Sequence, residues 1–198
     1  MKKLFIVLAT VTVSAGLFSG CLNFSSGNKS KNYKALNDML DANYSKVKIT
    51  LTDTFDDDTW LKSEYTITYS ESNISVKYAV ERFSEISIDN PTDEVKVIKS
   101  GEAIISGTEI SFTGDKIELS ADIAKLNFKF EEEYFTDAKL TNTSFVAAVK
   151  KPSEFYGSQI ICNDMSVNST FSDVFDTIKI KYTTYSGSKI EQTYIFTV

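Results

Sequence analysis

The sequence predicts an α+β fold, in which an N-terminal helix precedes a mainly antiparallel β-meander that forms a curved sheet or half barrel. Three observations lead to this prediction. The first folded segment has apolar residues at helical spacing, most later segments alternate apolar and polar residues, and turn sequences with Gly, Asn or Pro recur between them. Continuous apolar runs of the kind found in parallel sheets are missing.

The helix is predicted over residues 33–44. In the stretch "NYKALNDMLDANY", Tyr33, Leu36, Leu40 and Tyr44 follow one another at spacings of three and four, so they share one face. A helix of about 12 residues is marginal in isolation. We therefore expect this helix to dock on a larger element.

The strands are predicted from a change of period to two. In "LKSEYTITYS", residues 61–70, the side chains alternate between a largely apolar face and a polar face. The same alternation marks residues 47–51, 74–80, 126–130, 145–149 and 178–182. The last stretch, "TIKIKYTTYSGSKIEQTYIFTV", predicts a hairpin that turns at "YSGS", because Gly187 supplies the positive φ that such turns need.

The N-terminus has the layout of a secretory signal. Lys2 and Lys3 precede an apolar run over residues 4–17. Roughly 14 apolar residues span about 21 Å as a helix, less than the ~30 Å hydrocarbon core of a membrane. The run ends in "LFSGC", residues 17–21, which resembles the lipobox of bacterial lipoproteins, although Phe18 stands where leucine is usual. We expect a signal peptide over residues 1–20, with an unlipidated secreted protein as the alternative.

The lipobox resemblance implies that Cys21 carries a diacylglyceryl group and becomes the mature N-terminus. Two acyl chains hold a protein firmly on a membrane, so the expected location is the extracytoplasmic face of the cell membrane. Residues 21–32 have the composition of a flexible tether, which leaves residues 33–198 as a single β-rich domain. With Cys21 acylated, Cys162 has no partner for an internal disulfide and is expected to be a small buried apolar group.

Composition excludes several classes of function. Loss of the two signal-peptide lysines takes the formal net charge from −6 to −8, an acidity that repels nucleic acid. The chain has no histidine, which removes the usual general base and a common zinc ligand. No phosphate-binding glycine loop occurs. The sequence therefore predicts no enzyme, no cofactor and no metal site.

Two acidic clusters are candidates for chemistry. "DTFDDDTW" contains Asp53 and the aspartates at 56–58, and carboxylates can hold Ca²⁺, but the EF-hand spacing is absent. A solvated hairpin loop is the preferred interpretation. The glutamates at 131–133 could form an acid and base pair for glycoside hydrolysis. Consecutive strand residues point to opposite faces, so a solvated strand end is preferred there.

Aromatic residues are frequent, with ten Tyr, fourteen Phe and one Trp. Most are expected to fill the core. The inward-facing residues of the predicted strands are the alternative candidates for a groove that holds a ligand, and these are Tyr65, Ile67, Tyr78, Phe128 and Phe130.

The phrases "EEYFTDAKLTN", "KPSEFYG" and "YTTYSGSKIE" resemble small uncharacterised lipoproteins of low-GC Gram-positive bacteria. The order of elements is similar to the half barrels of the lipoprotein-carrier class, an analogy that transfers no site residue. The favoured function is a lipid-anchored, non-catalytic binding module for a hydrophobic ligand. The alternative is a structural or adhesive surface protein that binds another protein.

Overall fold

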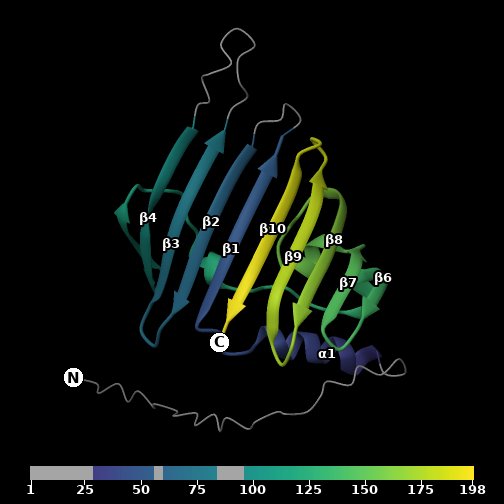
Figure 1. The fold of residues 1–198 in the computed structure, drawn as a ribbon. Helices are drawn as coiled ribbons and strands as arrows, with labels where there is room; N and C mark the ends of the chain where they lie inside the picture. Colours follow the sequence, from purple (N-terminus) through teal and green to yellow (C-terminus); the bar gives the residue numbers. More distant parts are fainter. Residues whose placement is uncertain (1–28, 56–59, 84–95) are drawn as a thin grey trace, which may run out of the picture.

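The chain is represented by a computed structural model that describes residues 29–55, 60–83 and 96–198. These residues form one ten-stranded antiparallel sheet with a few helical segments (Figure 1). The strands are β1 (Lys46–Thr54), β2 (Trp60–Tyr69), β3 (Ile74–Phe83), β4 (Lys96–Ser106), β5 (Glu109–Gly114), β6 (Phe135–Leu140), β7 (Ser144–Val149), β8 (Cys162–Phe171), β9 (Phe175–Thr184) and β10 (Lys189–Thr197). The helical segments are α1 (Lys29–Leu40), α2 (Pro152–Tyr156), and the 3₁₀ turns η1 (Ala121–Ala124) and η2 (Glu132–Tyr134).

The strand order is β5, β4, β3, β2, β1, β10, β9, β8, β7, β6. The first and last strands therefore pair at the centre, where Ile49 lies opposite Tyr194. The chain passes from the edge strand β5 to the edge strand β6 through residues 115–134, which we name the crossing segment. The predicted antiparallel meander is confirmed and the sheet is not closed, whereas "α+β" overstates the share of helix.

Successive side chains of a strand point to opposite faces of the sheet, and the register between neighbouring strands places the inward-facing residues side by side. On the inner face, Ile49 lies between Tyr65 of β2 and Tyr194 of β10. The outer face consists mainly of Thr, Lys and Glu, with exposed ion pairs such as Lys181–Glu191 at 2.7 Å. Such exposed pairs contribute little to stability, so the fold depends on the inner face.

The hydrophobic core lies on the inner face and extends across the sheet from Ala103 of β4 to Phe135 of β6, and it includes side chains of α1, α2 and the crossing segment. Four fully or almost fully buried rings form its centre, with centroids 5.1–5.9 Å apart in five pairs, and these are Phe130, Phe135, Phe145 and Phe155. α1 joins them through Tyr33, whose ring lies 6.0 Å from two of them. Aromatic pairs in these geometries add attraction beyond the area they bury.

The N-terminal helix occupies a different range from the one predicted. α1 begins at Lys29 and ends at Leu40, whereas helical spacing predicted residues 33–44. Tyr44 keeps its place in the core, and its hydroxyl donates to the Met39 carbonyl at 2.6 Å, which also accepts from Ala42 N–H at 3.3 Å. The tyrosine thus closes the helix from outside it.

The predicted strand over residues 126–130 is wrong, because these residues belong to the crossing segment and pair with no strand. Phe128 and Phe130 are buried while Lys129 is exposed, so the chain is extended and buries alternate side chains under the sheet. Its backbone groups form hydrogen bonds with α1 and α2. Lys129 N–H donates to the Phe155 carbonyl at 2.9 Å, and Phe130 N–H donates to the Asn37 side chain at 2.9 Å.

The other predicted strands fall within β1, β2, β3, β7 and β9, to within one residue at their ends. The C-terminal hairpin is also confirmed. It turns through "YSGS", where Gly187 has φ of 92° and its N–H donates to the Thr184 carbonyl at 3.0 Å. The predicted turn at "DNPTD", residues 89–93, lies outside the described residues.

Candidate functional site

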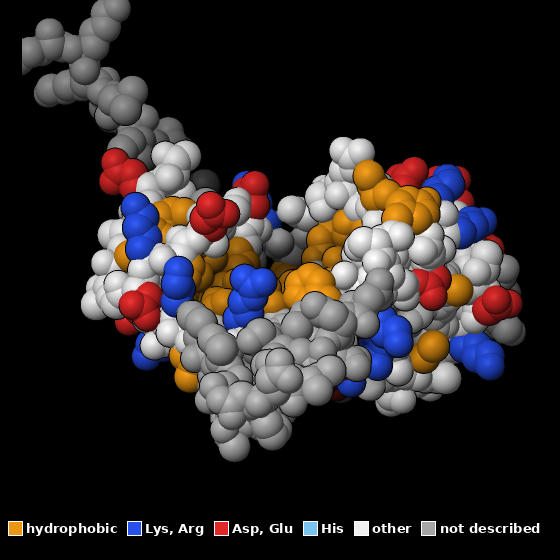
Figure 2. Space-filling view, turned by 90° about the horizontal axis from the view of Figure 1, so that it is seen from above, with side chains coloured by type: hydrophobic (Ala, Val, Ile, Leu, Met, Phe, Trp, Pro, Cys, Tyr) orange, Lys and Arg blue, Asp and Glu red, His pale blue; other side chains and the backbone are white. Residues whose placement is uncertain are grey.

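A cavity of about 450 Å³ lies on the inner face, between the centre of the sheet and the crossing segment. We name it the inner-face cavity. It is lined by Ile49, Leu51, Tyr65, Asp122, Ile123, Lys125, Asn127, Phe128, Tyr156, Gly157, Ser158, Gln192 and Tyr194. The space-filling view shows hydrophobic side chains gathered in a hollow between the two sides of the molecule (Figure 2). Its volume falls in the range of small-molecule sites.

The walls of the inner-face cavity combine apolar and polar surface, with the apolar surface slightly in excess. Leu51, Tyr65 and Ile123 are half-buried, so each keeps some surface free of protein contact. Phe128 is held more firmly, because its ring stacks on Phe155 at 5.6 Å and meets Tyr194 edge-on at 5.0 Å. A firmly packed base with partly free side walls is the arrangement of a preformed apolar site.

A cluster of neutral polar groups lies in one wall of the cavity. Gln192 is only 5% exposed, and its Oε1 accepts hydrogen bonds from the hydroxyls of Tyr156 at 2.6 Å and Tyr194 at 3.0 Å. The two hydroxyls lie 3.3 Å apart. Burial raises the pKa of Tyr194 far above its usual range, so this phenol stays protonated at neutral pH.

Charged side chains occur at the rim of the cavity. Lys125 Nζ and Asp122 Oδ1 form an ion pair at 2.7 Å, and both side chains are about two-thirds exposed, at 66% and 67%. An exposed pair of this kind is screened by solvent. The rim is therefore polar, while the interior of the cavity carries no net charge from these two residues.

Asp53 lies one row farther along β1, opposite Ile190 and Leu61 on the inner face. Its Oδ1 is buried and has no hydrogen-bond partner among the described residues. Burial raises the pKa of this carboxyl, because a charged form is poorly solvated there. The pKa of the neighbouring Tyr182 is raised to about 12 by burial first, and then by Tyr156 and the Asp53 carboxylate.

The crossing segment is fixed against α2 by a close backbone contact. Gly157 ends α2 with φ of 71°, a conformation that favours glycine. A Cβ at this position would lie 2.5 Å from the Asn127 carbonyl oxygen. Glycine therefore lets the crossing segment approach α2 and close the cavity on that side.

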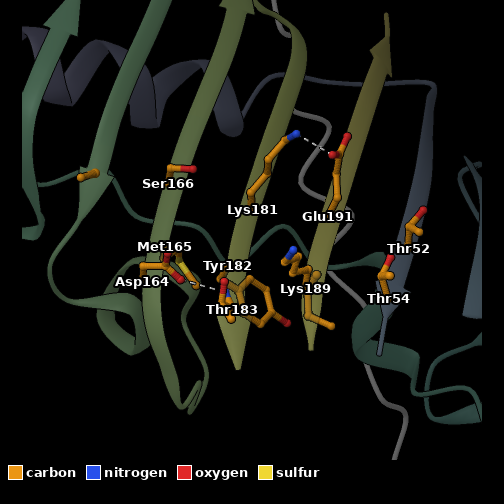
Figure 3. A pocket seen from close by; sticks show the side chains of 12 residues that line it. Thr52, Thr54, Asp164, Met165, Ser166, Lys181, Tyr182, Thr183, Lys189 and Glu191 are labelled. Atoms are coloured by element: carbon orange, nitrogen blue, oxygen red, sulfur yellow. Dashed lines mark hydrogen bonds and ion pairs between the residues drawn. The ribbon is translucent and has the colours of Figure 1, made fainter. Parts of the chain in front are cut away.

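A second hollow, of about 690 Å³, lies on the outer face (Figure 3). It is lined by Thr52, Thr54, Ala148, Asp164, Met165, Ser166, Lys181, Tyr182, Thr183, Lys189, Ile190 and Glu191. In Figure 3 the Lys181 and Glu191 side chains point toward one another, in agreement with their 2.7 Å ion pair. Lys181 is exposed and Glu191 is half-buried, and the Asp164 carboxylate accepts from Thr183 N–H at 3.0 Å. Because these polar groups already satisfy one another, we favour the inner-face cavity.

The residues singled out from the sequence are scattered. Cys21 and the aspartates at 56–58 lie outside the described residues. The glutamates at 131–133 are exposed, and Glu133 pairs with Lys151 at 3.2 Å. Cys162 is a half-buried free thiol whose pKa is raised by burial and by Asp164.

Of the five candidate groove residues, Tyr65 and Phe128 line the inner-face cavity. Ile67, Tyr78 and Phe130 are buried in the hydrophobic core and are not among its lining residues. Gln192 and Asp53 were not singled out as groove residues. The signal that could have found them is a polar residue at an inward position of an alternating strand.

Two general searches of the described ranges gave negative results. No group of three or more Asp, Glu, Cys or His side chains within residues 29–55, 60–83 and 96–198 is placed to hold a metal ion. No helix in this part of the chain combines the length and apolar character needed to cross a membrane.

Comparison with known proteins leaves the family open. No family model matches the chain, and no curated protein matches it. Among solved structures, an N-terminal dehydratase from the difficidin assembly line aligns over 78% of each chain at 9% sequence identity with a TM-score of 0.16. A similarity at that level carries no argument about fold or function.

Proposed function

We propose that the protein is a non-catalytic binding module that holds an apolar ligand in the inner-face cavity. The observation that carries the proposal is a cavity of about 450 Å³ with partly free apolar walls and a buried neutral cluster formed by Gln192, Tyr156 and Tyr194. Apolar walls with a few convergent polar groups are typical of small-molecule sites. The proposal assigns no catalytic residue.

The proposal includes an anchor at Cys21, which places the module on the extracytoplasmic face of the membrane. Its support is the lipobox-like "LFSGC" after the apolar run. Cys21→Ala removes the acceptor thiol, so the variant should leave the detergent phase in phase partitioning, whereas the wild type stays in it. A variant that partitions like the wild type would rule out lipidation at this residue.

Binding can be tested with the uncharged apolar fluorophore N-phenyl-1-naphthylamine. The purified protein should bind it saturably. Leu51→Trp places a larger side chain in the cavity and should weaken binding at least tenfold, because the ligand and the indole ring compete for the same space. Thr50→Trp is the matched control, since this residue lies on the outer face of the same strand.

The rival function is a surface protein that binds another protein. It is favoured by large apolar side chains exposed on the outer face, among them Val146 and Ile195. The dye titration separates the two proposals. If the wild type shows no saturable dye binding, or if Leu51→Trp and Thr50→Trp bind equally well, the cavity is not a ligand site and the surface function becomes the better proposal.

A further inference from the structure

The side chain of Gln192 has a hydrogen-bond donor left over. Its Oε1 accepts from the hydroxyls of Tyr156 and Tyr194, which fixes the amide plane. No described residue accepts a hydrogen bond from its Nε2. Gln192 is 95% buried, at 5% exposure, and lines the inner-face cavity. Nε2 is not among the fully buried polar atoms without a partner in the described residues, so it keeps contact with open space and is free to donate to water or to a ligand.

The same surroundings disfavour charge. Burial raises the pKa of Tyr194 far above its usual range, which indicates that an anion is poorly solvated in this wall. The cation that lines the cavity, Lys125, is already paired with Asp122 at the exposed rim. Asp53, one row away, adds an acidic group. An anionic ligand would therefore find repulsion and little compensating positive charge.

We infer that the ligand is an uncharged acyl ester or acyl amide, whose carbonyl oxygen accepts a hydrogen bond from Gln192 Nε2 while its chain lies along Leu51, Tyr65 and Ile123. A carbonyl oxygen supplies the missing acceptor without bringing a charge. The three side chains are the half-buried walls that leave room for an apolar chain. The inference rests on the proposed function, since the cavity must first admit an apolar ligand.

The first test is a competition between ligands of similar length on the purified protein. Bound N-phenyl-1-naphthylamine is displaced by methyl decanoate, by decanoate at a mildly alkaline pH that keeps it ionised, or by dodecane. One hydrogen bond to a buried amide should make methyl decanoate effective at about tenfold lower concentration than dodecane. Decanoate should displace the dye no better than dodecane does.

The second test removes the amide. Gln192→Leu has a similar size but no amide donor, so methyl decanoate should lose its advantage over dodecane, with both compared by displacement of the dye at the dye affinity measured for the variant. Thr193→Val is the matched control, because it removes a polar group from the outer face beside the same position. Circular dichroism checks folding. If Gln192→Leu does not fold, Gln192→Met takes its place, and the ranking on the wild type stands as a test without any variant.

The outcomes distinguish the inference from the proposed function. If the wild type does not bind the dye saturably, both are wrong. If the dye binds but methyl decanoate is no better than dodecane, or decanoate is the best competitor, only the inference is overturned. The same holds if Gln192→Leu keeps the preference for the ester.

Discussion

At the scale of single residues, Tyr44 connects the end of α1 to the start of β9. Its hydroxyl donates to the Met39 carbonyl at 2.6 Å and accepts from Phe175 N–H at 3.1 Å. Burial raises the pKa of Tyr44 to about 12, an effect that the Phe175 hydrogen bond opposes and Asp176 reinforces. One phenol thus satisfies two backbone groups that are far apart in the sequence.

Tyr44→Phe should lower the free energy of unfolding by about 1–3 kcal/mol, because the Phe175 N–H loses its partner and the Met39 carbonyl keeps only the Ala42 N–H, while the ring is retained. Urea denaturation measures the change. Tyr185→Phe is the control, since that side chain is 71% exposed and should be neutral. Equal stability of Tyr44→Phe and the wild type would contradict the role given to the hydroxyl.

The raised pKa of Tyr44 also predicts how stability depends on pH. The folded protein keeps this proton up to about pH 12, whereas the unfolded chain begins to lose it near the ordinary value of 10.0. The folded state binds more protons in this window, so stability falls as pH rises from about 10 to 12, by up to about 3 kcal/mol for this group. Tyr44→Phe should show a shallower alkaline loss, and parallel curves would be the contrary result.

At this scale the sequence predicted which face of the sheet a side chain points to, but not which residues it contacts. The alternation of β1 and β10 correctly places side chains on one face or the other. It cannot show that Gln192 meets Tyr156, because that contact joins β10 to α2. Asp53 was therefore assigned to a solvated acidic loop, although it lies in β1 on the inner face, and Gln192 was not singled out at all.

At the scale of elements, helices hold the part of the crossing segment around Phe130, while β2 contributes a hydrogen bond farther along it, from the Tyr69 hydroxyl to the Ala124 carbonyl at 2.9 Å. The Asn37 side chain from α1 reproduces one step of a β-ladder, because its Oδ1 accepts from Phe130 N–H and its Nδ2 donates to the Phe130 carbonyl, both at 2.9 Å. On the other side, α2 accepts from Lys129 N–H at 2.9 Å. The inner-face cavity lies beside this part of the crossing segment.

Asn37→Ala should destabilise the protein by about 2 kcal/mol, since it leaves two backbone groups of Phe130 unpaired. Amide hydrogen exchange at Phe130 should become faster. Asp38→Ala is the neighbouring control, because it removes only an exposed ion pair with Lys34 and should cost about 0.5 kcal/mol or less. Unchanged exchange at Phe130 in Asn37→Ala would mean that the side chain does not hold the segment.

Elements with clean alternation were predicted, and elements with interrupted alternation were missed. β8 has the fully buried Ser169 at an inward position, where its Oγ donates to the Phe145 carbonyl at 3.4 Å. β6 contains a bulge between Thr136 and Lys139 that breaks the period, with Asp137 at φ of 53°. In residues 126–130 buried and exposed side chains do alternate, but the segment does not pair with any strand of the sheet.

At the scale of the whole molecule, the fold is one wide open sheet, and the two halves of its inner face are covered differently. Helix α1 lies beside the half formed by β6 to β9 (Figure 1). The cluster of phenylalanine rings belongs to the same half, and the cavity lies at the centre, against β1, β2 and β10. The central β1–β10 pair joins the two ends of the described fold. Local periodicity carries no information about such a distant pairing, so neither the strand order nor the cavity was predictable in detail.

The most direct test of the account is to locate a bound ligand by photocrosslinking. A fatty methyl ester with a diazirine in its chain is irradiated with the purified protein, and labelled positions are mapped by mass spectrometry. We expect labels on the lining residues Leu51, Tyr65 and Ile123, and their loss in Leu51→Trp but not in Thr50→Trp. Labels concentrated on outer-face residues such as Ile195, or labels that Leu51→Trp leaves unchanged, would contradict the account.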